Sequence, residues 1–68
     1  MHQWTKILIG CYNTPQGIRA YHTQYFRHDI SGVQAYERAR ANLIVSKIHN
    51  RDYLLNCLAI GNFKVMPD

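Results

Sequence analysis

The strongest local signal in this sequence is the start of a helix at Ser31. Gln34 follows three residues later, a spacing that forms a capping box and satisfies free amides of a helix's first turn. Ile30, directly before this box, is suited to act as a hydrophobic staple. The segment from Val33 to about Asn50 contains good helix formers and neither Pro nor Gly. We therefore predict one helix from Val33 to about Asn50.

The apolar stripe of this helix is broader than one neighbouring layer can cover. When the residues are placed around a helix at about 100° per residue, apolar side chains form a central stripe, and further apolar side chains widen it on both sides. The stripe comprises Val33, Tyr36, Ile44 and Ile48, with Ala41, Leu43 and Val45 beside it. We expect the sheet to cover one side of the helix and another chain to cover the rest, an arrangement that allows a homodimer.

The remaining segments have the composition and alternation of β-strands. The sequence predicts strands at 4–12, 18–27, 53–60 and 63–66, with turns at 13–17 and 61–62. Pro15 fixes the φ angle of the first turn, and Gly17 is suited to its end. The fold class that follows is α+β: a small antiparallel sheet in the chain order β-β-α-β-β, with one helix packed across it.

The chain has 68 residues, so we expect a single domain spanning residues 1–68. A domain this short buries only about 60% of the surface of its unfolded chain and is marginally stable alone. Hydrophobic residues make up 47% of the sequence, which argues against disorder. Eight Lys and Arg against four Asp and Glu give 8 − 4 = +4 at pH 7. An anionic partner is therefore expected, either nucleic acid or an acidic protein surface.

No motif gathers the groups needed for catalysis or for cofactor binding. The carboxylates are scattered, and the glycines form no phosphate-binding loop. Cys11 and Cys57 lie in segments predicted to be strands, without metal-ligand spacing, and are expected to be reduced and buried. We expect no enzyme activity, no cofactor and no metal site. No apolar run approaches the ~20 residues of a membrane span, and the first residues lack the form of a signal peptide, so a cytoplasmic location is expected.

Cations alternate with aromatic rings along one face of the predicted second strand. This face comprises Arg19, Tyr21, Thr23, Tyr25 and Arg27, and His28 continues it. Such a pattern pairs with phosphates and stacks on bases, but Tyr and Arg are also enriched at protein interfaces. A third interpretation points both tyrosines toward the helix and into the core. The other candidate partner-binding residues lie on or just after the predicted helix and are Arg38, Asn42, His49 and Arg51.

The layout resembles that of very short phage-encoded antagonists, among them anti-CRISPR proteins and phage antitoxins. The resemblance covers the whole chain, is architectural, and transfers no functional residue. It rests on the strand TKILIGCY, the turn NTPQG, the helix SGVQAYERARANLIVSKI and the closing segment YLLNCLAIGNFKVM. It implies a non-enzymatic inhibitor that occludes a site on a host defence or nucleic-acid-processing complex, a larger protein or ribonucleoprotein in the bacterial cytoplasm. The alternative is a small basic DNA- or RNA-binding regulatory protein.

Overall fold

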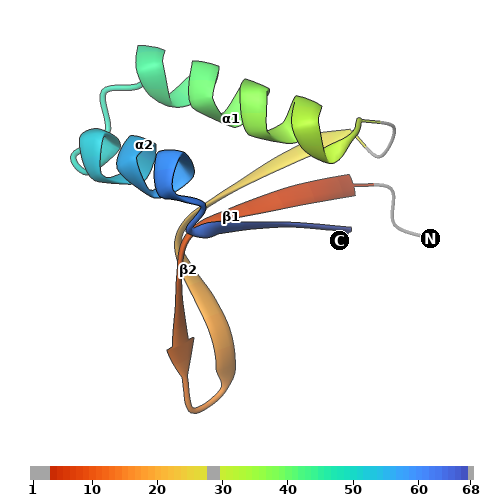
Figure 1. Ribbon diagram of the computed structural model, residues 1–68, viewed down its shortest axis with the longest axis vertical. Coiled ribbons are helices and arrows are strands. Elements are labelled where there is room, and N and C mark those ends of the chain that lie inside the picture. The colour runs from red at the N-terminus through yellow and green to blue at the C-terminus, as the bar shows by residue number, and fades with distance from the viewer. Residues whose placement is uncertain (1–3, 28–29, 68) are drawn as a thin grey trace.

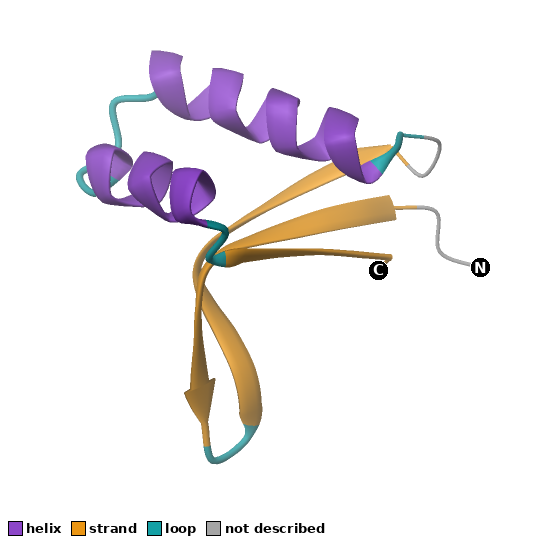
Figure 2. Cartoon of the chain, viewed as in Figure 1, coloured by secondary structure: helices purple, strands orange, loops and turns teal. Residues whose placement is uncertain are grey.

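A computed structural model describes residues 4–27 and 30–67 as a sheet covered on one face by two helices (Figures 1 and 2). The elements are β1 (Trp4–Thr14), β2 (Gly17–Arg27), α1 (Gly32–Val45), α2 (Arg51–Ile60) and β3 (Phe63–Pro67). The three strands form an antiparallel sheet in the order β2-β1-β3. The predicted α+β class is confirmed. The predicted order is wrong, because the chain runs β-β-α-α-β with two helices.

The two predicted N-terminal strands are confirmed as a long hairpin. β1 and β2 keep one register from Trp4 opposite Arg27 to Thr14 opposite Gly17, with a break in the pairing at Gly10. The loop is therefore shorter than the predicted turn. The Thr14 hydroxyl closes it, donating to the Gly17 carbonyl at 2.8 Å and accepting from the Gln16 amide at 3.2 Å. Gly17 has a φ of 120°, a conformation that side chains disfavour.

The hairpin bends at Gly10, so its far end turns away from the helices (Figure 1). Gly10 has a φ of 74°, and its N–H donates to the Asn62 carbonyl at 2.9 Å. The next amide, at Cys11, donates to Asn62 Oδ1 at 3.0 Å. Consecutive amides thus point toward the same residue, which breaks the regular alternation of a strand. β3 pairs with β1 only as far as Ile9, so the hairpin continues beyond the bend as a two-stranded ribbon.

The predicted start of α1 is confirmed, and its predicted end is wrong. The Ser31 hydroxyl accepts from the Gln34 amide at 3.1 Å, and the Gln34 side chain accepts from the Ser31 amide at 3.0 Å. The helix stops at Val45 rather than near Asn50, because Ser46 is extended, with ψ at 154°. The Ser46 hydroxyl accepts from the Ile48 amide at 3.2 Å, a local bond that competes with helix continuation.

The segment predicted as the third strand, 53–60, lies instead in α2. An apolar run of this length fits a buried strand or a buried helix equally well by periodicity alone. Leu54, Cys57 and Leu58 share the helical spacing i, i+3, i+4 and are all buried. The predicted turn at Gly61 is the end of this helix: Gly61 is left-handed at φ 85°, and the Asn62 amide donates to the Cys57 carbonyl at 2.8 Å. Cys57 is therefore a buried helical thiol, and both cysteines are free.

The core lies between the helices and one face of the sheet. Its buried residues come from every element except β3 and are Ile7, Ile9, Phe26, Ala35, Ala39, Leu43, Leu54, Cys57 and Leu58. Ala35, Ala39 and Leu43 follow one another at four-residue spacing along the buried side of α1. Part of the predicted apolar stripe remains outside this core, since Val45 is 79% exposed. In the described part of the chain no helix is long and apolar enough to cross a membrane.

Replacing Gly10 tests the bend. A Cβ at Gly10 lies 2.8 Å from Tyr21 Cδ2, and the backbone has a positive φ, so Gly10→Ala is expected to lower the free energy of unfolding by about 1–3 kcal/mol. Gly32→Ala is the matched control, because a Cβ there meets nothing within 4 Å and φ is not left-handed. Its unfolding free energy is expected to stay the same or rise by up to about 1 kcal/mol. Urea titration measures both, and equal losses would contradict the assigned bend.

Candidate functional site

The face of the sheet turned away from the helices carries a cluster of rings and cations. Ile7, Ile9 and Phe26 point into the core, so the residues that alternate with them point to the other side. We call this side the open face; it comprises Trp4, Lys6, Leu8, Thr23, Tyr25, Arg27, Lys64 and Met66. Both helices lie against the opposite face in Figure 2. The open face is therefore the main uncovered surface of the described sheet.

The register of the sheet sets a ring beside a cation in two neighbouring rows. Trp4 lies opposite Arg27, and Tyr25 lies opposite Lys6. Met66 lies on the other side of Lys6, from β3. Directly opposite residues have Cβ atoms about 4.5–5.5 Å apart, so each ring and its cation are immediate neighbours. Trp4 is 45% exposed and Tyr25 is 56% exposed, large fractions for aromatic side chains.

Half of the Lys and Arg residues lie in the sheet. The three strands contain Lys6, Arg19, Arg27 and Lys64 but neither Asp nor Glu. The carboxylates that the structure describes, Glu37 and Asp52, both lie in helices. Three of the four strand cations, Lys6, Arg27 and Lys64, lie on the open face, where they attract an approaching anion.

Eight of the nine residues predicted to bind a partner lie in four different places. Tyr25 and Arg27 lie on the open face, whereas Arg19 and Tyr21 lie on the hairpin beyond the bend. Arg38 and Asn42 lie on α1, and His49 and Arg51 lie in or beside the connection between the helices. His28 lies outside the described residues. The interpretation that points both tyrosines into the core is wrong, because Tyr21 and Tyr25 are exposed and the buried side of β2 is that of Phe26.

Tyr21 belongs to an aromatic cluster rather than to the ring and cation rows. Its ring centroid lies 4.8 Å from that of Tyr12 and 5.5 Å, edge to face, from that of Tyr53 on α2. A hydrogen bond with the Cys57 side chain, followed by desolvation, raises the pKa of Tyr53, so this phenol stays neutral. The ring contact between Tyr21 and Tyr53 fixes the bent hairpin against α2.

Asn42 makes a structural contact with the sheet. Its side-chain amide donates to Gln24 Oε1 at 2.9 Å, and Gln24 Nε2 lies 3.1 Å from His22 Nε2. An amide nitrogen only donates, so this ring nitrogen of His22 accepts and the imidazole is neutral. Burial lowers the pKa of His22, in agreement with that assignment. These three side chains join α1 to β2.

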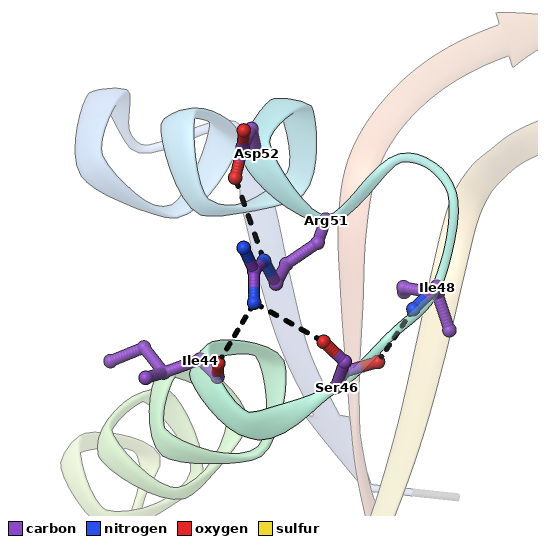
Figure 3. Close-up of polar contacts among 5 residues, drawn as sticks. All are labelled: Ile44, Ser46, Ile48, Arg51 and Asp52. Carbon is purple, nitrogen blue, oxygen red and sulfur yellow. Dashed lines mark hydrogen bonds and ion pairs between the residues drawn. The ribbon is translucent and has the colours of Figure 1, made fainter.

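Arg51 holds the end of α1 (Figure 3). Its Nη1 donates to the carbonyls of Ile44 at 3.1 Å and Ser46 at 3.3 Å, and its Nε lies 3.5 Å from Asp52. Carbonyls at a helix C-terminus lack partners within the helix, so a cation there is stabilising. A hollow of about 280 Å³ lies beside this contact; its lining residues are Ser46, Lys47, Ile48, His49, Arg51 and Asp52. Asp52 lowers the positive charge of this hollow.

No group of three His, Cys, Asp or Glu side chains within residues 4–27 and 30–67 is placed to hold a metal ion. No protein-family model matches the chain, and comparisons with curated proteins and with solved structures found no match. The candidate surface therefore rests on its own geometry.

Sequence reasoning missed most of the open face. The alternation along the first strand already groups Trp4, Lys6 and Leu8, but it leaves undecided which side the helices cover. Lys64 and Met66 join them only because β3 pairs with β1, and not with residues 53–60 as predicted. The open face was missed because residues 53–60 were predicted to be a strand, whereas they lie in helix α2.

Arg51→Ala tests the structural role of this arginine. The variant loses two carbonyl contacts at the end of α1, and because the side chain is partly exposed we expect a loss of about 1 kcal/mol of unfolding free energy. Arg40→Ala, an exposed position on α1, is the control and is expected to change it by less than about 0.5 kcal/mol. Thermal unfolding compares the two; an unchanged midpoint for Arg51→Ala would contradict the assignment.

The stability of the protein is expected to depend on pH through His22. Its pKa in the folded state lies below the unfolded value of 6.5, so the unfolded state binds the proton more tightly. The stabilisation is complete above pH 6.5 and is lost as the pH falls from there toward the folded pKa. His22→Gln, which cannot titrate, is expected to flatten this part of the curve. Urea midpoints between pH 8 and pH 5 measure it, and parallel curves would refute the role of His22.

Proposed function

We propose that this protein is a non-enzymatic binding protein that blocks a larger host complex, as small phage-encoded inhibitors do. The target is a defence or nucleic-acid-processing complex, a ribonucleoprotein with an anionic surface. The open face is the docking surface. The observation that carries the proposal is the placement of a ring beside a cation in two neighbouring rows of the open face, Trp4 with Arg27 and Tyr25 with Lys6.

The side chains of the open face are those that dominate binding energies. Trp, Tyr and Arg are the residues most enriched among interface hot spots, and Met is enriched at interfaces as well. Tyr25 and Trp4 lie on a sheet held rigid by the core behind it, so little conformational entropy is lost when they are covered. A rigid surface with exposed rings suits occlusion of a partner's site.

The described His, Cys and carboxylate side chains lie away from the open face, which supports binding rather than catalysis. His22 is directed to the helix side of the sheet and is bonded to Gln24. Cys57 is buried in the core. Glu37 and Asp52 lie on different helices. The described part of the open face therefore lacks the imidazole and carboxylate groups that most often serve in general acid and base catalysis.

A second candidate function is a small DNA- or RNA-binding regulatory protein. The observation that favours it is the pairing of rings with cations, because rings stack on bases while cations pair with phosphates. This candidate uses the same surface but needs no protein target. The material captured by the protein distinguishes the two functions.

Affinity capture from bacterial lysate tests the proposed function. The tagged protein is expected to retain a multi-subunit nucleic-acid-processing complex at moderate salt. Tyr25→Ala combined with Arg27→Ala is expected to lose it, because both residues lie on the open face. Tyr53→Ala combined with Arg40→Ala is the matched control, also one tyrosine and one arginine, both exposed but off this face.

Retention by the control pair and loss by the open-face pair support the proposal. Recovery of nucleic acid without any protein complex would support the regulator instead. Loss of the complex by the control pair alone would place the docking surface on the helices and contradict the proposal.

A further inference from the structure

We infer that the open face binds single-stranded nucleic acid, and that this strand is the part of the target complex that the protein occupies. The inference rests on the proposed function, since it names the chemistry of the same docking surface. An unpaired strand offers both phosphates and unstacked base faces, and the open face offers a partner for each.

The spacing of the two rings fits consecutive bases. Trp4 lies opposite Arg27, so Tyr25, two residues before Arg27 in β2, is a diagonal neighbour of Trp4. Diagonal neighbours on one face of an antiparallel pair lie about 7–8 Å apart. Bases stacked along one strand are about 3.4 Å apart, so the distance between the two rings is roughly twice the distance between stacked bases. Each ring can therefore hold one base when the strand is extended, without the two bases overlapping.

The cations are placed to follow the backbone of such a strand. Lys6 lies between Tyr25 and Met66, and Lys64 lies opposite Leu8 in the next row. Together with Arg27, they distribute positive charge over all three strands of the open face. A phosphate beside either ring therefore lies near at least one cation.

A duplex fits this surface less well than a single strand. The bases of a duplex are stacked on one another, so flat rings cannot reach their faces. The major groove admits a helix or a two-stranded ribbon, whereas the open face is the flat side of a three-stranded sheet with helices behind it. A duplex would meet only the cations, and its binding would depend more on salt than on the rings.

The unique tryptophan reports on this binding directly. Trp4 is the only Trp in the chain, so its fluorescence is expected to fall when a base stacks on it. A thymidine oligonucleotide of about 12 nucleotides and a uridine oligonucleotide of the same length are the probes. A DNA duplex of that length is the comparison. We expect quenching by both single strands, at lower concentration than any quenching by the duplex.

Two substitutions separate the contributions of ring and cation. Tyr25→Ala is expected to weaken single-strand binding at least roughly tenfold, with little change in its salt dependence. Lys64→Ala is expected to reduce the salt slope by about 0.7, the value for one phosphate contact on a single strand. Tyr53→Ala and Arg40→Ala, on the helices, are the controls and are expected to leave both quantities unchanged. All four positions are exposed, and circular dichroism checks that each variant is folded.

The inference is overturned if the duplex binds as tightly as the single strands, or if Tyr25→Ala binds like the parent protein. It is also overturned if the captured complex stays bound after nuclease has removed its accessible nucleic acid. In that last case the proposed function stands, because the open face then binds an acidic protein surface. Release of the complex by nuclease, together with Trp4 quenching, supports the inference.

Discussion

The packing of two helices against one face of a three-stranded sheet determines the other features of this protein. Ile7 and Ile9, on the central strand, are fully buried beneath α1 and α2. Their burial fixes which side of every strand points inward, because alternation leaves the neighbouring residues on the other side. A chain of 68 residues contains no further described element to cover that second side. The open face, with Trp4 and Tyr25, is thus a consequence of how the core is filled.

Local signals predicted local structure well. The turn containing Pro15 and Gly17 and the capping box at Ser31 depend on neighbouring residues, and both formed as expected. The apolar run 53–60 carried no such signal, because every position is compatible with a buried strand or a buried helix. Its state depends on packing against α1 and against β1, and β1 lies far away in the sequence. That single error changed the chain order and the partner of β3.

The candidate surface was predictable only in part, for the same reason. The alternation of Tyr25 and Arg27 with buried residues was visible in β2, but the face they share with Trp4 and Lys6 depends on strand register. Other predicted residues have structural contacts: Asn42 joins α1 to the sheet, and Arg51 holds the end of α1. Net charge predicted an anionic partner without locating it. The structure places half of the cations in the strands, with Lys6, Arg27 and Lys64 on the open face.

The central claim is that partners bind the open face and not the helices. Nuclear magnetic resonance of the nitrogen-15-labelled protein tests it most directly, by titration with the thymidine oligonucleotide. We predict chemical-shift changes at the Trp4 indole and at the amides of Lys6, Tyr25 and Lys64, with the amides of α1 nearly unchanged. Changes confined to Lys47 and its neighbours in the hollow between the helices would contradict it.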